Sequence, residues 1–106
     1  MDRRTLVYAP RAQRDLLALP ARHARQILSD LELLQAPPWP PGKVRKLHGV
    51  DFWEVKTGDC RSIFWPRGKQ VIVVRVVLRR DLIRTLDRVD LAALIAWLRD
   101  RIEGKS

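Results

Sequence analysis

The chain has 106 residues and a formal net charge of +9, with 21 Lys and Arg against 12 Asp and Glu. This length suits one domain, so we expect residues 1–106 to fold around one core. An apolar fraction of 46% argues against a disordered chain. The excess positive charge favours a polyanionic partner, which means nucleic acid, an anionic membrane surface or an acidic protein.

No apolar run reaches the roughly 18 residues that a membrane-spanning helix needs. The longest candidate, 71–78, is interrupted by Arg75. The N-terminus lacks the long apolar region of a secretory signal, so we expect a soluble, cytoplasmic protein. The single cysteine, Cys60, excludes an internal disulfide framework. Together with His23 and His48 it matches no zinc spacing, so the sequence predicts neither a metal nor another cofactor.

The first third of the chain predicts a strand followed by a helical hairpin. Residues 5–9 alternate as a short strand does, and Pro10 suits the first turn of a helix. Pro20 ends that helix. A second helix is predicted over 21–35, where apolar residues recur at helical spacing.

A proline-rich loop at 37–42 is expected to connect this hairpin to three strands, 52–56, 61–66 and 70–78. The strands are separated by short segments that contain glycine, which is typical of an antiparallel meander. Period 2 places Arg75 on the same face as Val71 and Val73.

A last helix is predicted to begin after Asp90, a good N-cap, and to end at Gly104. The expected order is β-α-α-β-β-β-α, an α+β fold with an antiparallel sheet, an N-terminal helical hairpin and a C-terminal helix. We expect the helices to cover one face of the sheet and to leave the other free for binding.

The turn at Gly58-Asp59 concentrates positive charge. If these residues form a two-residue hairpin loop, Lys56 lies directly opposite Arg61. Facing like charges are destabilising, so the pair is expected to hold an anion, and phosphate is the obvious one. Arg79 and Arg80 at the end of the next strand add to the field. The plain alternative is a solvated basic face.

Proton transfer near such a phosphate has several candidates. Glu54 shares a face with Lys56 and could accept a proton, although an ion pair with Lys56 or Arg61 explains it equally well. Lys56 is the other candidate base, if neighbouring cations favour its neutral form. His48 could act as an acid or a base, because histidine as a residue type exchanges protons near neutral pH, yet a lone loop histidine is more often only solvated. Trp65 shares a face with Arg61 and is the best candidate for stacking on a base.

Four short segments carry a resemblance to a known family. They read Lys-Leu-His-Gly at 46–49, Phe-Trp-Glu-Val-Lys at 52–56, Gly-Asp-Cys-Arg-Ser-Ile-Phe-Trp at 58–65 and Val-Val-Leu-Arg-Arg-Asp-Leu-Ile at 76–83. In this order and spacing the chain resembles the RelE/ParE superfamily of toxins from bacterial type II toxin–antitoxin pairs. Each segment alone is weakly specific, but their order and spacing together are fairly specific. The N-terminal strand and helical hairpin also fit the family, so the resemblance covers most of the chain; the residues at family-like spacing there are Tyr8, Ala12, Asp15, Leu16 and Leu19.

The resemblance implies a ribosome-dependent, metal-independent mRNA endoribonuclease, or mRNA interferase, that inhibits translation. Its expected partners are a cognate antitoxin, the ribosome and mRNA. The basic or catalytic positions of the family match Lys46, Lys56, Arg61 and Arg79, with Arg80 as the alternative to Arg79. The predicted site therefore has catalytic residues Lys56, Arg61, Arg79 and Glu54, and RNA-binding residues Lys46, Arg80, Trp65 and His48.

Three positions depart from the nuclease pattern. Cys60 replaces a frequent hairpin tyrosine, Glu54 replaces a lysine of some members, and Ile83 stands at the tyrosine that follows the basic cluster. A second branch of the superfamily keeps the fold, lacks the nuclease residues and inhibits DNA gyrase. That branch is the alternative function, with gyrase as the partner. A basic nucleic-acid-binding domain without toxicity is a third possibility.

Overall fold

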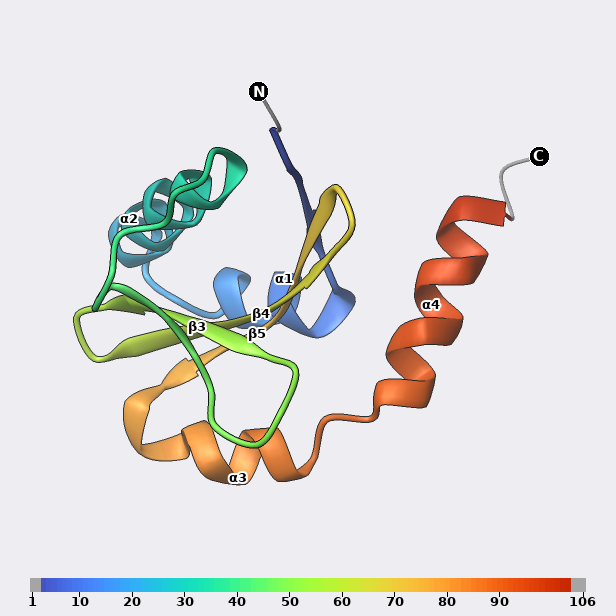
Figure 1. Ribbon diagram of the computed structural model, residues 1–106. Coiled ribbons are helices and arrows are strands. Elements are labelled where there is room, and N and C mark those ends of the chain that lie inside the picture. Colours follow the sequence, from blue (N-terminus) through green and yellow to red (C-terminus); the bar gives the residue numbers. More distant parts are fainter. Residues whose placement is uncertain (1–2, 104–106) are drawn as a thin grey trace.

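The computed structural model describes residues 3–103 (Figure 1). The strands are β1 (Thr5–Tyr8), β2 (Val44–Lys46), β3 (Trp53–Thr57), β4 (Cys60–Arg67) and β5 (Gln70–Leu78). The helices are α1 (Pro10–Leu17), α2 (Ala21–Leu31), α3 (Leu82–Asp87) and α4 (Leu91–Glu103), with 3₁₀ turns η1 (Glu32–Gln35) and η2 (Arg79–Asp81).

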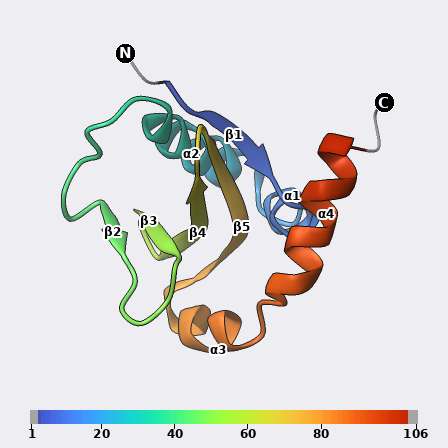
Figure 2. The same ribbon diagram turned by 45° about the vertical axis from the view of Figure 1, so that its right-hand side comes forward.

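The strands form one five-stranded sheet in the order β1-β5-β4-β3-β2. Neighbours from β2 to β5 pair antiparallel, so the predicted meander and the α+β class are confirmed. The first strand instead pairs parallel with β5, at the opposite edge from β2 (Figure 2). Strand β2 and helix α3 are absent from the predicted order, because three and six residues are too few to show a period.

Glycine sets the register of both hairpins. Gly58 and Gly68 have φ of +57° and +60°, and no other residue type among the described ones has a positive φ. A two-residue loop in which only the first residue, a glycine, has a positive φ forms a type II′ turn, and this turn type matches the twist of the flanking strands. Lys56 consequently lies opposite Arg61, as predicted.

The N-terminal helical hairpin covers one face of the sheet. Pro10 begins α1, where its missing N–H is not needed, and both predicted helices are confirmed. Their buried residues and those of η1 pack on alternate residues of β3, β4 and β5; this cluster contains Ala12, Ile27, Leu31, Leu34, Val44, Val55, Phe64, Val71, Val73 and Val76.

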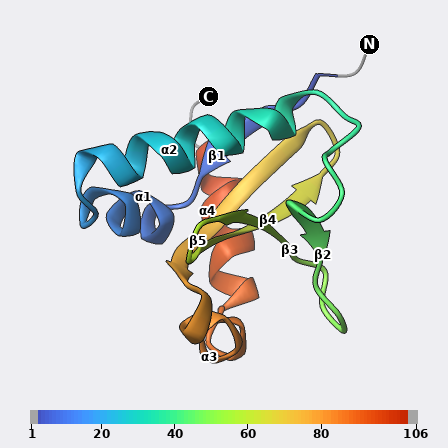
Figure 3. The same ribbon diagram turned by 90° about the vertical axis from the view of Figure 1, so that its left-hand side faces the viewer.

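The opposite face is covered by α3 and α4, so the expectation that helices lie on one face only is wrong (Figure 3). Leu82 of α3 and Leu94 and Leu98 of α4 pack there against apolar residues of β1, β4 and β5. The cause is that β5 carries Val or Ile on both faces, and each face needs a cover. Asp90 caps α4 as predicted, because its Oδ1 accepts from the Ala93 N–H at 3.0 Å. Gly104 lies outside the described residues.

A β-bulge changes the predicted face of Arg75. Ile63 pairs with Arg75 but Phe64 pairs with Val73, so Val74 is an extra residue in β5. After this insertion Val76 lies on the face of Val73, whereas Arg75, which pairs with Ile63, lies on the opposite face. The Arg75 guanidinium instead forms a bidentate contact with Asp15 of α1, at 2.8 and 3.1 Å.

Candidate functional site

The end of the sheet near the β3–β4 turn brings together cations from three segments. Lys56 on β3 lies opposite Arg61 on β4, and Arg61 lies opposite Val77 on β5. The chain then passes beside the turn, where the Arg79 backbone N–H donates to the Asp59 carbonyl at 2.7 Å. The predicted grouping of Lys56, Arg61 and Arg79 at one end of the sheet therefore has its backbone basis in the register.

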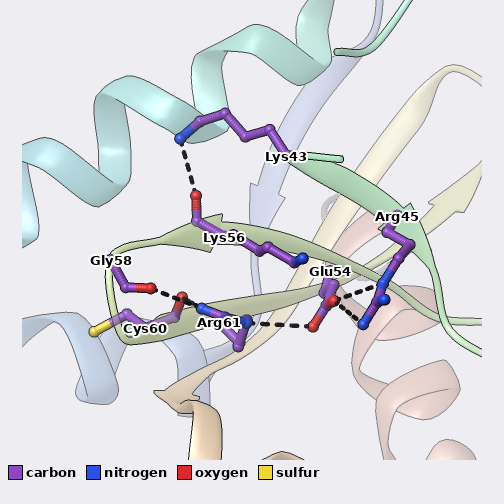
Figure 4. Close-up of polar contacts among 7 residues, drawn as sticks. All are labelled: Lys43, Arg45, Glu54, Lys56, Gly58, Cys60 and Arg61. Atoms are coloured by element: carbon purple, nitrogen blue, oxygen red, sulfur yellow. Dashed lines mark hydrogen bonds and ion pairs between the residues drawn. The ribbon is translucent and has the colours of Figure 1, made fainter. Parts of the chain in front are cut away.

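Glu54 lies beside Arg61 and is completely buried. Its Oε2 accepts from Nε of Arg45 at 3.0 Å and lies 2.8 Å from Nη2 of the same arginine. Its Oε1 lies 3.6 Å from Nε of Arg61 and has no hydrogen-bond partner among the described residues (Figure 4). The anion that the facing charges of Lys56 and Arg61 require is thus supplied in part by the chain itself.

Burial of Glu54 bears on its predicted catalytic role. The Glu54 carboxylate has no exposed surface and contacts two arginines, so we do not propose it as the general base. The alternative role expected from the sequence, an ion pair with Arg61, is present, inside the protein and not on its surface. Arg45 is the second partner of Glu54.

Arg61 is fixed within the hairpin. Its side chain is only 10% exposed. Its Nη1 donates to the carbonyl oxygens of Gly58, at 2.8 Å, and Cys60, at 3.0 Å. The guanidinium therefore holds the turn in place and contributes charge from beneath the surface.

Lys56 has a rigidly placed backbone and a half-buried side chain. Its N–H donates to the Lys43 carbonyl at 2.9 Å, and its own carbonyl accepts from Nζ of Lys43 at 2.9 Å. Lys43 Nζ also lies 3.0 Å from Oδ2 of Asp30 on α2, which accepts from the Thr57 hydroxyl at 2.6 Å. Figure 4 shows the Lys56 side chain running along the sheet toward Glu54.

Two predicted RNA-binding residues lie at the end of β2 and in the loop that follows it. Lys46 is exposed, and its Nζ donates to the carbonyl oxygens of Leu47, at 3.3 Å, and Val50. His48 is exposed in the same loop. Both side chains are open to solvent, although Lys46 also stabilises its own loop.

The remaining predicted residues differ in accessibility. Arg79 and Arg80 are exposed on η2. Trp65 is half-buried: its ring packs edge-on against Phe52 with centroids 6.3 Å apart, and Arg67 lies 5.0 Å from the ring centroid. Part of the surface proposed for base stacking is thus already occupied. Ile83, at the position of the family tyrosine, is 69% exposed.

Sequence reasoning missed Arg45. The residue lies on β2 directly opposite Glu54, and its side chain is 59% exposed although the carboxylate it binds is not exposed at all. A three-residue strand gives no periodic signal, so the sequence could not show that Arg45 and Glu54 are neighbours.

The described part of the chain holds neither a metal-binding cluster nor a helix suited to a bilayer. Within residues 3–103, no three His, Cys, Asp or Glu side chains gather where they could hold a metal ion. No helix in that range combines the length and the apolar character that crossing a bilayer requires.

Comparison with known proteins identifies the family. The family described as ParE toxin of type II toxin-antitoxin system, parDE, matches residues 6–83, whereas no curated protein matches. Helix α4 lies outside this matched range.

Three solved structures share the fold. An archaeal RelE–RelB complex from Pyrococcus horikoshii matches with TM-score 0.62 and 27% identity over 74% of this chain and 97% of that one. The RelBE2 toxin–antitoxin complex from Mycobacterium tuberculosis matches with TM-score 0.63 and 21% identity, over 74% of this chain and 94% of that one. A RelB–RelE antitoxin–toxin complex from Methanococcus jannaschii matches with TM-score 0.60 and 19% identity, over 79% of this chain and 99% of that one. The chain belongs to the ParE toxin family, within the RelE/ParE superfamily of type II toxins.

Proposed function

We propose that this toxin is a ribosome-dependent mRNA endoribonuclease that inhibits translation and is held inactive by a cognate antitoxin. The observation that carries the proposal is the backbone register, which brings Lys56, the buried Arg61 and Arg79 to one end of the sheet, with Arg80 next along the chain. Such a group of cations suits a phosphodiester whose negative charge increases in the transition state.

Each residue has a distinct role in the proposed reaction. Lys56 takes the proton of the ribose 2′-hydroxyl as that oxygen attacks the adjacent phosphorus. Exposed Arg79 and Arg80 hold the phosphate oxygens, which a guanidinium can bind at two points. The bond to the 5′-oxygen then breaks, and His48 is the proposed donor of the proton that this leaving oxygen needs.

RNA contacts beyond the phosphate are assigned to Lys46 and to the exposed part of Trp65. Arg61 adds positive charge without touching the substrate. The resemblance to the nuclease branch implies a reaction that needs no metal ion. The similarity to a RelE toxin solved in complex with RelB supports an antitoxin partner. An excess of nine positive charges favours an antitoxin segment that is acidic.

A second candidate function is inhibition of DNA gyrase through protein contact alone. Two observations favour it. The exposed Ile83 offers no proton at the position of the family tyrosine, and Glu54 and Arg61 are engaged with each other. A toxin of this kind needs a complementary surface but no reacting groups.

The two functions separate in one experiment. The chain is expressed without an antitoxin, the 5′ ends of cellular transcripts are mapped, and plasmid supercoiling is measured in the same cultures. We expect growth arrest, new 5′ ends within translated reading frames, and normal supercoiling. Intact transcripts together with relaxed or broken DNA would reject the nuclease and support the gyrase inhibitor.

A further inference from the structure

Arg45 lies at the boundary between the buried carboxylate and solvent. It reaches Glu54 with Nε at 3.0 Å and Nη2 at 2.8 Å, and both contacts are made to the same oxygen, Oε2. Its side chain remains 59% exposed. One side of the guanidinium is thus fixed against the protein while much of the group stays accessible.

The contact with Glu54 leaves some N–H groups of Arg45 without an acceptor among the described residues. A guanidinium has five N–H groups in a planar fork, and the Glu54 contact engages only the side that carries Nε and Nη2. Nothing else in residues 3–103 accepts a hydrogen bond from Arg45. The remaining N–H groups are therefore available to an acceptor outside the protein, and oxyanions such as phosphate match their geometry.

The local charge also favours an anion. One carboxylate faces two guanidiniums, so Glu54, Arg45 and Arg61 together keep one formal positive charge, to which Lys56 adds another. Arg61 is almost enclosed, so Arg45 is the arginine of this group that a ligand can reach. Figure 4 shows Arg45 and Lys56 on the same side of the sheet, with Glu54 between them.

We propose that Arg45 binds a backbone phosphate of single-stranded RNA, and that Glu54 is a positioning residue that fixes the guanidinium for this contact. An arginine held in place before binding loses less side-chain entropy when the ligand arrives. The inference deepens the proposed function, because it assumes that RNA is the ligand of this face.

The test measures RNA affinity as a function of salt. The purified full chain is titrated with a short labelled 2′-O-methyl oligoribonucleotide, which lacks the hydroxyl needed for cleavage. For single strands, the slope of log K against log salt becomes shallower by about 0.7 for every phosphate that the protein no longer neutralises. We expect this reduction for Arg45→Ala. The control is Arg25→Ala, for which we expect an unchanged slope, because Arg25 is an exposed arginine on α2, in the helical hairpin that covers the other face of the sheet.

Glu54→Gln separates positioning from simple charge. The substitution raises the net charge by one, so charge alone predicts tighter RNA binding. If Glu54 positions Arg45, the variant binds several-fold more weakly in spite of the added charge. Circular dichroism checks that the variant is folded. If Glu54→Gln does not fold, the salt slope of Arg45→Ala alone tests the proposal, because Arg45 is largely exposed and its removal should leave the fold intact.

An unchanged slope for Arg45→Ala overturns the inference and leaves Arg45 as a structural partner of Glu54 only. Transcript mapping keeps this outcome apart from the proposed function. A reduced slope with uncut transcripts supports Arg45 as a phosphate ligand and rejects the nuclease, whereas cut transcripts with an unchanged slope do the reverse.

Discussion

Glu54 is a buried carboxylate that pairs with two arginines, Arg45 and Arg61, and so neutralises part of their charge. Removing a carboxylate from water costs several kcal/mol, and two arginine contacts offset this cost only while both partners are present. The same contacts draw Arg61 inward, where its Nη1 binds the carbonyls of the hairpin turn. Glu54 therefore supports the hairpin from inside the protein, and the groups that we propose to react, such as the half-buried Lys56, lie nearer the surface.

Glu54→Gln is expected to lower the free energy of unfolding by about 3 kcal/mol, because it leaves Arg61 buried without its counter-ion. Urea denaturation followed by tryptophan fluorescence measures the change. Asp87→Asn is the matched control, since it makes the same carboxylate-to-amide change at an exposed position of α3, and its effect should stay within about 0.5 kcal/mol. Equal stabilities of the two variants would show that the buried ion pair contributes nothing.

At the scale of elements, the hairpin register was predictable and the bulge was not. Gly58-Asp59 specifies a two-residue turn, and the turn fixes Lys56 opposite Arg61. Alternation alone placed Arg75 on the face of Val73, because a single inserted residue leaves no mark in a run of β-branched residues. The strand β2 has only three residues and gives no periodic signal, so neither the strand nor the contact between Arg45 and Glu54 could be predicted.

The bulge fastens α1 to β5. The Asp15 carboxylate accepts from Nε of Arg75 at 2.8 Å, from Nη2 at 3.1 Å and from the Val76 N–H at 2.8 Å. Both side chains are about four-fifths buried, at 17% and 21% exposure, so solvent weakens these contacts less than it would on an open surface.

Asp15→Asn should cost about 2 kcal/mol of stability, since it removes a charge-assisted bidentate contact and leaves Arg75 without a counter-ion. The midpoint of urea unfolding should fall with no change in its m-value. Asp100→Asn on α4, an exposed carboxylate, provides the comparison. A midpoint for Asp15→Asn that equals the wild-type value would mean that the clamp does not hold α1 on the sheet.

For the whole molecule, helices on both faces limit where a partner can bind. α1 and α2 cover one face and α3 and α4 the other, so the accessible part of the sheet lies near the β3–β4 turn and the β2–β3 loop. The cations of the sequence predict a binding site in this region, which stays a prediction, whereas the expectation of helices on one face is wrong. The Val and Ile of β5 indicate a strand that is buried on both faces, but they do not show that α3 and α4 cover the second face, because that packing depends on contacts between distant parts of the chain.

The most direct test of the account is cleavage of mRNA on purified, programmed ribosomes, detected by primer extension. We compare the wild-type toxin with Lys56→Ala, which removes the proposed base, and with Lys69→Ala, which removes an exposed lysine at the other hairpin turn. We expect cleavage by the wild type and Lys69→Ala, and a rate at least about 100-fold lower for Lys56→Ala. Uncut mRNA with the wild type, or equal rates for all three proteins, would contradict it.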